Sequence, residues 1–282
     1  MSKQIYIIKA NGEKEFFDNS KLENSLRKAG AGAPVIATIV NKIENELKDG
    51  TETIEIYRRA FDLLDKFERG TAAQYSLRHA VLELGPTGFP FENFIGAIFR
   101  AKGFETKLRQ RIKGLCISYE VDLMARNDEK FIIGEVKFHN KRGIKSDLKV
   151  VLYVKERFDD IEKGEFYGNI DRNLKKEKWL ITNTKFTTRA IDYGRCCADL
   201  MLVSWNYPKQ GNLYQLITEA GLYPITCLKT LGRNDKKLFL DRNIVLCREL
   251  SQGRERLFNL VGIPAEKREN ALEEISNLIP NT

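Results

Sequence analysis

Residues 119–138, YEVDLMARNDEKFIIGEVKF, contain two strand-like runs joined by the turn-forming letters NDE, which predicts a β-hairpin. The apolar letters FIIG directly before Glu135 predict a buried strand, where charged side chains are rare unless they have a partner or a use. Because side chains alternate along a strand, Glu135 and Lys137 project from one face and Val136 from the other. Asp122 lies on the first strand of the hairpin, from which it could approach Glu135 across the ladder.

These side chains suit a metal-dependent reaction. Carboxylates on neighbouring strands offer the oxygen ligands that Mg2+ (or Mn2+) prefers, and the backbone carbonyl of Val136 offers another. A lysine beside such a metal can orient or help deprotonate an attacking water and stabilise charge on a phosphate. Together these groups would deliver metal-assisted phosphodiester hydrolysis. An ordinary strand with a solvated charged face remains the alternative, because this spacing also occurs by chance.

The flanking chain predicts a mixed α/β sheet. Residues 85–94, GPTGFPFENF, interrupt the helical periodicity and mark a boundary. Beyond it we expect a helix over 91–103, the hairpin, and a second helix over 147–158. The runs KWLITNT and DLMLVSW then predict two further strands, separated by a helix in TTRAIDYGRCCA.

In this region the blocks FENFIGAIFRAKGF, YEVDLMA, IIGEVKFHN and WLITNTKFTTRAIDYG resemble the PD-(D/E)xK superfamily, over about residues 89–206. More narrowly, they resemble its Mrr-type enzymes and archaeal Holliday-junction resolvases. The resemblance implies a restriction-endonuclease-like fold that acts on DNA, with Asp122 and Glu135 as metal ligands and Lys137 as the catalytic lysine. Glu92 matches the acidic residue that often completes such sites. The superfamily's proline before the aspartate is missing here.

Further candidates lie near these residues. Glu120 shares the strand face of Asp122 and is either a supporting group or a surface charge. His139 and Asn140 extend the motif towards a phosphate, and Asn183 and Lys185 lie at the carboxyl end of a strand, where α/β sites gather. The basic stretch HNKRGIKSDLK is either a grip on a DNA backbone or a solvated loop.

The first part of the chain predicts a small hairpin followed by helices over about 21–30, 33–48, 54–67 and 72–84. The stretches IIKANGEKEFFDNSKLENSL, TETIEIYRRAFDLL and TAAQYSLRHA resemble the ATP-cone, a nucleotide-sensing module of ribonucleotide reductases and their repressors. The resemblance implies that Lys9 and Lys21 approach the phosphates of ATP or dATP, with Glu15 and Thr53 near the nucleotide. At position 10 many relatives have an arginine, whereas this chain has Ala10. A degenerate cone kept for oligomerisation is the alternative.

The composition of the chain limits which partners and which cellular location we expect. The 282 residues carry a net charge of +8, and residues 86–208 contain 23 basic against 17 acidic side chains, which fits a polyanionic partner such as DNA. No apolar run reaches the roughly 20 residues that cross a bilayer, and no signal peptide is recognisable, so we expect a cytoplasmic protein without membrane contact. Five cysteines without a CxxC pair predict reduced structural thiols.

We therefore expect an α/β protein in three parts. These are a mostly helical ATP-cone over 1–85, a restriction-endonuclease-like mixed α/β nuclease domain over 86–208, and a small helical region over 209–282. The last part faintly resembles helix-hairpin-helix DNA-binding modules, and a docking bundle is the alternative. The predicted function is a Mg2+-dependent DNA endonuclease in genome defence or repair, a homo-oligomer gated by a nucleotide effector. Two other classes stay open: a DNA-structure-binding protein that does not cut, and a nucleotide-sensing regulatory partner.

Overall fold

The computed structural model describes residues 5–9, 12–141, 143–197 and 199–279, without the side chains at 69, 70, 73, 74 and 254. Ala10, which departs from the cone pattern, lies outside these residues. The contacts between residues divide the chain into two compact units. Unit 1 comprises Met1–Ala80, Tyr223–Phe239 and Cys247–Thr282, and unit 2 comprises Val81–Leu222 and Leu240–Leu246. The division into three domains is not tested by this grouping and stays a prediction.

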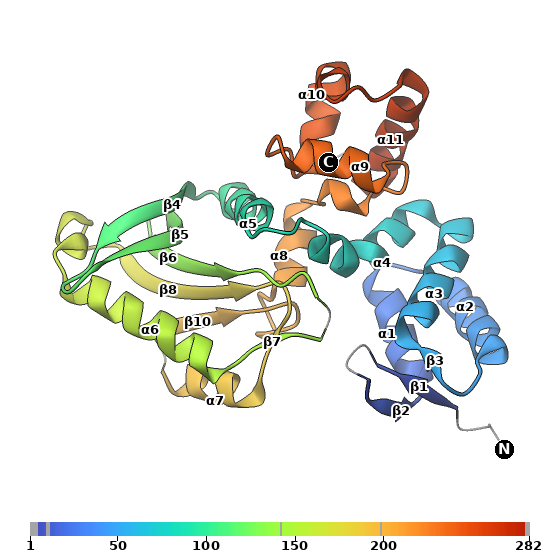
Figure 1. Cartoon of the computed structure of the whole chain (residues 1–282), viewed down its shortest axis with the longest axis horizontal. Coiled ribbons are helices and arrows are strands. Elements are labelled where there is room, and N and C mark those ends of the chain that lie inside the picture. Colours follow the sequence, from blue (N-terminus) through green and yellow to red (C-terminus); the bar gives the residue numbers. More distant parts are fainter. Residues whose placement is uncertain (1–4, 10–11, 142, 198, 280–282) are drawn as a thin grey trace. The chain divides into compact units, whose positions relative to one another are not determined.

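The first part of unit 1 is a small sheet followed by helices, as predicted (Figure 1). Its elements are β1 (Tyr6–Ile8), β2 (Lys14–Phe16), α1 (Asn19–Lys28), α2 (Ala33–Glu46), β3 (Thr51–Glu52), α3 (Thr53–Phe67) and α4 (Arg69–Leu82). Asp18 caps α1 by accepting a hydrogen bond from the Ser20 N–H at 2.9 Å. Helix α3 begins at Thr53 itself, one residue before the predicted start, because β3 pairs with β1 and Glu52 takes the cap position.

The remaining part of unit 1 comes from the end of the chain and is helical, as expected. It contains η2 (Ile225–Cys227), α10 (Cys247–Leu260), α11 (Ala265–Leu278) and most of α9 (Arg233–Leu240). A buried hydrogen bond of 2.7 Å runs from the Thr226 hydroxyl to the carbonyl of Ala80. Lys229 lies 4.0 Å from the centroid of the Phe61 ring on α3. The end of the chain therefore packs directly on the cone helices.

Unit 2 is built on a five-stranded mixed sheet with the order β10-β8-β6-β5-β4 (Figure 1). Its elements are α5 (Phe89–Ala101), β4 (Glu105–Lys113), β5 (Ser118–Arg126), β6 (Lys130–Lys137), β7 (Lys145–Ser146), α6 (Leu148–Lys163), η1 (Phe166–Asn169), β8 (Lys175–Thr182), β9 (Lys185–Phe186), α7 (Thr188–Cys196), β10 (Leu200–Val203) and α8 (Leu213–Ala220). Strands β6, β8 and β10 are parallel, whereas β4, β5 and β6 form an antiparallel meander. The mixed α/β class is thus confirmed, and the predicted hairpin is β5 and β6.

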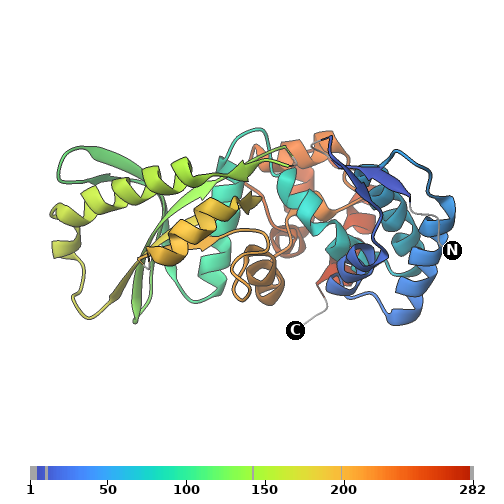
Figure 2. The same ribbon diagram turned by 90° about the horizontal axis from the view of Figure 1, so that it is seen from below.

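Helices cover both faces of this sheet. Helix α5 packs on β4, β5 and β6, while α6 and α7 lie on the opposite face, which Figure 2 shows from the outside. Apolar side chains at every third or fourth position of α6 (Val151, Val154, Phe158 and Ile161) pack with Ile133 of β6. Strand β6 is therefore covered by α5 on one face and by α6 on the other. Burial on both faces explains why the run FIIG, residues 131–134, is continuously apolar.

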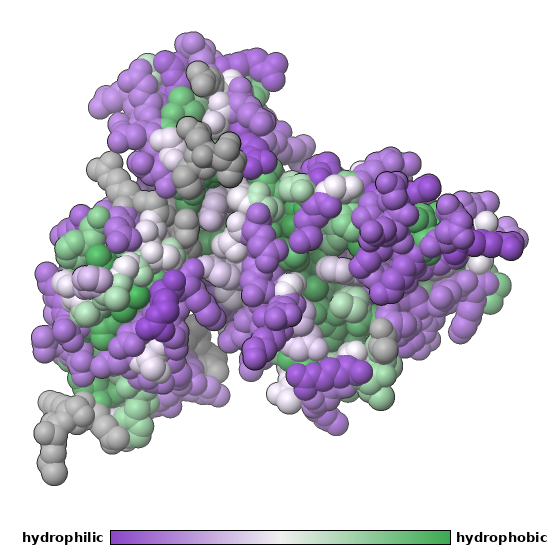
Figure 3. Space-filling model, turned by 180° about the vertical axis from the view of Figure 1, so that it is seen from behind, coloured by the Kyte–Doolittle hydropathy of each residue, from purple (hydrophilic) through white to green (hydrophobic). Residues whose placement is uncertain are grey.

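Strand β4 and helix α8 were not predicted. In β4 charged side chains alternate with partly buried ones, because it is the edge strand and one face meets water. On the face of the molecule in Figure 3, hydrophilic residues form most of the surface and hydrophobic ones gather in limited areas. Within the described ranges, none of the helices combines the length and hydropathy needed to cross a bilayer.

Candidate functional site

The structure brings the two predicted metal ligands together on neighbouring strands. The register pairs Leu123 with Gly134, so that Asp122 comes opposite Glu135. The backbone N–H of Val136 donates to Oδ2 of Asp122 at 2.7 Å. This bond fixes the Asp122 carboxylate against the end of β6, beside the Glu135 side chain and the Val136 backbone.

The Glu135 carboxylate is almost fully buried, with 3% of the residue exposed, and it lies between two cations. Lys137 Nζ donates to its Oε1 at 2.5 Å, and Arg157 Nη1 donates to its Oε2 at 2.9 Å. The second terminal nitrogen of Arg157 donates to the backbone carbonyl of Glu120, whose own side chain is exposed. The Nε of Arg157 is buried and has no hydrogen-bond partner among the described residues. A buried charge needs such pairing, because an unpaired one is strongly destabilising.

The Asp122 carboxyl is electrostatically crowded. Burial and the neighbouring negative charge of Glu135 raise its pKa to about 7, and Glu92 adds to the rise. The N–H of Val136 and the charge of Lys137 oppose the shift without cancelling it. A cation placed among these carboxylates would relieve the repulsion, so the electrostatics favour a positively charged ligand here.

Glu92 lies in the first turn of α5 and is held by Arg109 of β4. Arg109 Nη1 donates to Oε2 of Glu92 at 3.0 Å and to Oδ1 of Asn93 at 3.1 Å. Arg109 stands opposite Asp122 in the β4–β5 register, with a left-handed backbone of φ 52°. A non-glycine residue with this backbone is strained, and such strain is concentrated at functional sites.

Two of the other candidates, His139 and Asn183, hold the end of β6 in place. His139 and Asn183 exchange two hydrogen bonds: the His139 N–H donates to Oδ1 of Asn183 at 2.9 Å, and Nδ2 of Asn183 donates to the His139 carbonyl at 2.8 Å. The His139 ring contacts the buried Ser146 hydroxyl at 3.2 Å, and burial followed by the charge of Lys137 lowers its pKa. Asn140 is exposed, and Lys185 lies in β9, paired with β7. His139 and Asn183 thus bind the end of β6 to the segment after β8.

The geometry of the site supports the predicted metal ligands only in part. Among the residues that the structure describes, no group of three or more His, Cys, Asp and Glu side chains is arranged to hold a metal ion. Asp122, Glu135 and the Val136 carbonyl form a smaller oxygen-rich set of the kind that Mg2+ accepts with additional waters. To reach Glu135, an ion has to displace one of its two cationic partners. The donor chemistry fits the metal, and the ligand set stays a prediction.

The predicted nucleotide residues of the cone also lie together. Glu15 accepts from Lys9 at 2.8 Å and from Lys21 at 3.2 Å. The hydrogen bond from Lys9 lowers the pKa of Glu15, and the same bond raises that of Lys9. The Thr53 hydroxyl donates to the carbonyl of Ile8 at 3.3 Å, joining the start of α3 to β1. Two cations that a phosphate could use are thus held by one carboxylate.

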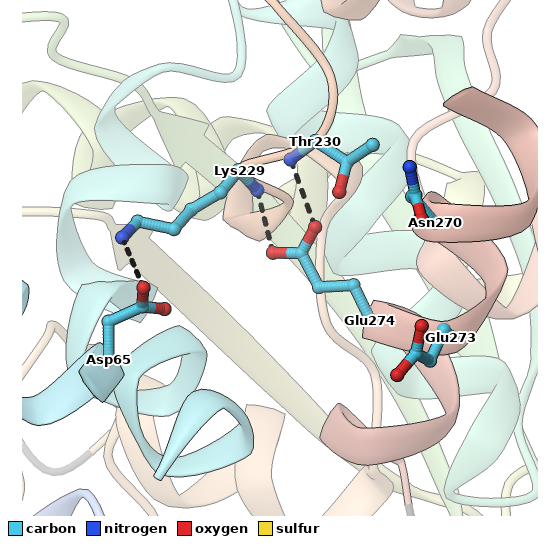
Figure 4. A pocket seen from close by; sticks show the side chains of 6 residues that line it. All are labelled: Asp65, Lys229, Thr230, Asn270, Glu273 and Glu274. Atoms are coloured by element: carbon cyan, nitrogen blue, oxygen red, sulfur yellow. Dashed lines mark hydrogen bonds and ion pairs between the residues drawn. The ribbon is translucent and has the colours of Figure 1, made fainter. Parts of the chain in front are cut away.

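A cavity of about 400 Å³ in unit 1 lies between α3 and the segments around Lys229 and α11 (Figure 4). Lys229 Nζ is 3.0 Å from the Asp65 carboxylate. The Glu274 carboxylate accepts the backbone N–H groups of Lys229 and Thr230 at 2.7 and 3.0 Å. Asn270 and Glu273 line the same cavity from α11. These bonds attach α11 and the loop before α9 to the carboxyl end of α3.

Arg157 and Arg109 were not among the predicted site residues. Arg157 adjoins the apolar stripe of a helix that was predicted, and a charged side chain beside such a stripe signals a buried partner. The sequence does not indicate which residue that partner is. Arg109 belongs to the unpredicted β4, and its strained backbone has no sequence signature.

Comparisons with known proteins identify both ends of the chain. Residues 5–78 match the ATP cone domain, which confirms the cone, and residues 223–279 match a family described as AF1548-like, C-terminal. An uncharacterized protein of Archaeoglobus fulgidus is 32% identical over 180 residues, which cover 63% of this chain and 95% of that protein. A crystal structure described as a protein of unknown function, AF1548, is 28% identical, with a TM-score of 0.55 over 70% of this chain and all of that one.

Proposed function

The chain belongs to the AF1548-like family, and we propose that it is a Mg2+-dependent DNA endonuclease controlled by ATP or dATP at its cone. The relatives carry no functional names, so the proposal comes from the residues themselves. The observation that carries it is the meeting of Asp122, Glu135 and Lys137 at the end of β6, with the Asp122 pKa raised to about 7. Groups with strongly shifted pKa values are characteristic of catalytic sites.

Each side chain has a part in phosphodiester hydrolysis. A metal ion bound by Asp122, Glu135 and the Val136 carbonyl would supply Lewis-acid stabilisation of the phosphate. Lys137, 2.5 Å from Glu135, lies within reach of the same oxygens and would orient the attacking water and stabilise negative charge. Arg157 holds Glu135 in place from α6, and the paired His139 and Asn183 keep the strand end fixed. Glu92 would complete the set if Arg109 released it.

Control by nucleotide is supported by the cone match and by the arrangement of Lys9, Glu15 and Lys21. Phosphates would compete with Glu15 for the two ammonium groups. Binding there would change the assembly of copies of the chain and thereby gate cleavage, since an effector acts through its differential affinity for two states. We place the protein in the cytoplasm, as a homo-oligomer in DNA defence or repair.

A second candidate is a DNA-structure-binding protein that does not cut, with its oligomeric state set by nucleotide. The pairing of Glu135 with two cations favours it, because a carboxylate held in this way is also a stable structural feature. The basic middle of the chain suits both candidates.

The test is cleavage of duplex, branched and single-stranded DNA with Mg2+ or Mn2+, comparing the wild type with Glu135→Gln. Asp128→Asn is the matched control, because it removes an exposed carboxylate at the turn of the same hairpin. We expect cleavage by the wild type and the control and none by Glu135→Gln. Equal cleavage by all three, or binding without cleavage in every metal, contradicts the endonuclease proposal, and the latter supports the second candidate.

Nucleotide control is tested separately by titrating ATP and dATP calorimetrically, followed by sedimentation with and without the nucleotide. We expect binding and a change in mass. Binding without any change in mass or cleavage would show that the cone does not act through assembly.

A further inference from the structure

The two arginines that hold carboxylates of the candidate site also lie over aromatic rings. Arg157 Cζ is 5.5 Å from the centroids of Tyr119 and Tyr153, and Arg109 Cζ is 5.5 Å from the centroid of Phe89. Guanidinium groups favour this position because the ring face is electron-rich. Each ring is thereby held in a defined position beside a carboxylate of the site.

Two of these aromatic residues have more than half of their surface exposed to water. Tyr153 is 61% exposed on α6, and Phe89 is 54% exposed at the start of α5. Helices α6 and α5 cover opposite faces of the sheet (Figure 1). Each ring contacts the arginine that holds a carboxylate of the site: Arg157 links Tyr153 to Glu135, and Arg109 links Phe89 to Glu92. The contacts with Arg157 and Arg109 fix the position of each ring and leave more than half of each residue exposed to water.

The surface next to Tyr153 is suited to a polyanion. Lys149 lies one helical turn before Tyr153 on the same face of α6, and both Lys149 and Lys145 are exposed. An ammonium group one helical turn from an aromatic ring places a cation beside a surface on which a base can stack. Proteins that bind single strands combine such stacking rings with basic side chains.

We propose that Tyr153 and Phe89 are stacking platforms for unpaired nucleobases of DNA, one on each side of the sheet that carries Asp122 and Glu135. A base stacks on the ring face that the guanidinium leaves open, and Lys149 contacts the phosphate next to the base on Tyr153. The substrate class is accordingly DNA with unpaired nucleotides at the site of action, because paired bases are not available for stacking. The inference rests on the proposed function because it takes DNA as the ligand. It does not depend on whether the protein cuts the DNA strand.

The test uses a 30-base-pair duplex and the same duplex with a three-nucleotide unpaired bulge containing 2-aminopurine. Binding is measured by anisotropy in EDTA, so that no cleavage intervenes, and stacking by quenching of the 2-aminopurine fluorescence. The wild type is expected to prefer the bulged DNA and to quench its fluorescence. Tyr153→Ala and Phe89→Ala each lose roughly 5- to 150-fold of the affinity for bulged DNA, and their affinity for the duplex stays unchanged.

Two control variants separate stacking from a structural effect. Tyr153→Phe retains the ring and therefore the preference, and Phe67→Ala removes an equally exposed ring (53%) from the cone without consequence. Lys149→Ala weakens binding to bulged DNA and reduces its salt dependence, whereas Lys163→Ala at the far end of α6 does neither.

Equal affinity of the wild type for both DNAs, or full quenching by Tyr153→Ala, overturns the inference. Preference and quenching without cleavage in Mg2+ or Mn2+ support it and reject the endonuclease. Cleavage in Mg2+ or Mn2+ without a preference for bulged DNA and without fluorescence quenching supports the endonuclease and rejects the stacking platforms.

Discussion

A carboxylate paired with two cations occurs in a candidate site of each unit. In the cone, Glu15 lies between Lys9 and Lys21, and in the sheet, Glu135 lies between Lys137 and Arg157. The side chain of Glu15 is 24% exposed, whereas that of Glu135 is 4% exposed. Chemically the two networks are alike, and they differ in how much water surrounds them.

This difference determines what each network can do. Water screens the exposed network, so its ion pairs contribute little to stability and exchange readily with a soluble anion. In the buried network each charge depends on its partners, and removing one leaves an uncompensated charge in a poorly solvated place. The exposed network is suited to a reversible effector, and the buried one is suited to chemistry at fixed atoms.

The largest expected effect of a substitution is on cleavage. Lys137→Ala should lower the rate of DNA cleavage by about 100- to 10,000-fold, because it removes the group that orients water and stabilises charge. Single-turnover cleavage in Mg2+ measures this. Lys163→Ala, at the exposed far end of α6, is the matched control, and a comparable loss in that variant would contradict a specific role of Lys137.

The next effect is on stability. Arg157→Ala should lower the free energy of unfolding by about 3 kcal/mol, since it leaves the buried Glu135 with one cationic partner. Urea titration compares it with Lys21→Ala, for which we expect little change. Equal destabilisation by the two variants would mean that the buried network around Glu135 contributes no more to stability than the exposed network around Glu15.

The pH dependence of stability sharpens the comparison further. The pKa of Asp122 is about 7 in the folded protein, compared with 3.8 for an ordinary aspartate, which stands for the unfolded chain. Between pH 3.8 and pH 7 the folded protein therefore binds more protons at this residue than the unfolded chain does. Its stability therefore falls as the pH rises through this window. Asp122→Asn should remove the penalty, making the advantage of the variant larger at pH 8 than at pH 5 by about 2–3 kcal/mol. Urea unfolding in EDTA at both values measures this, and a pH-independent difference would contradict it.

The smallest expected effect concerns the effector. Lys9→Ala should weaken the binding of ATP about tenfold by removing one phosphate contact, and the loss should shrink at high salt. Calorimetry at two ionic strengths measures it, with Lys14→Ala as a neighbouring exposed control. Unchanged affinity would mean that Glu15 keeps Lys9 and that the nucleotide binds elsewhere.

The sequence was sufficient for those parts of the site that lie along one hairpin. Alternation and a short turn place Asp122 opposite Glu135, and the structure confirms that they are neighbours. The Asp18 cap was also predictable, because its hydrogen bond is local. Their chemical roles stay predictions.

Contacts between distant segments could not be predicted. Arg157 reaches Glu135 from a helix 22 residues later, and nothing local specifies that meeting. Arg109 holds Glu92 only because an edge strand with a polar pattern bends through a left-handed residue. The bonds from Thr226 to Ala80 and from Lys229 to Asp65 span still longer separations. Such pairs depend on tertiary packing, which overrides local preference.

The chain leaves unit 1 after Ala80, returns at Tyr223, leaves again after Phe239 and returns at Cys247. Unit 2 is therefore inserted into unit 1 and not appended to it, and four covalent connections join them. A single proteolytic cut at the first or the second of these connections, after Ala80 or before Tyr223, would leave the two fragments linked by the contacts of Thr226 and Lys229 with the cone. Genetic truncation after Ala80 would give a cone that lacks the later segments of its unit, Tyr223–Phe239 and Cys247–Thr282. The cone part of unit 1 is thus completed by segments that follow unit 2 in the sequence, so that a chain shortened before Tyr223 lacks part of the unit.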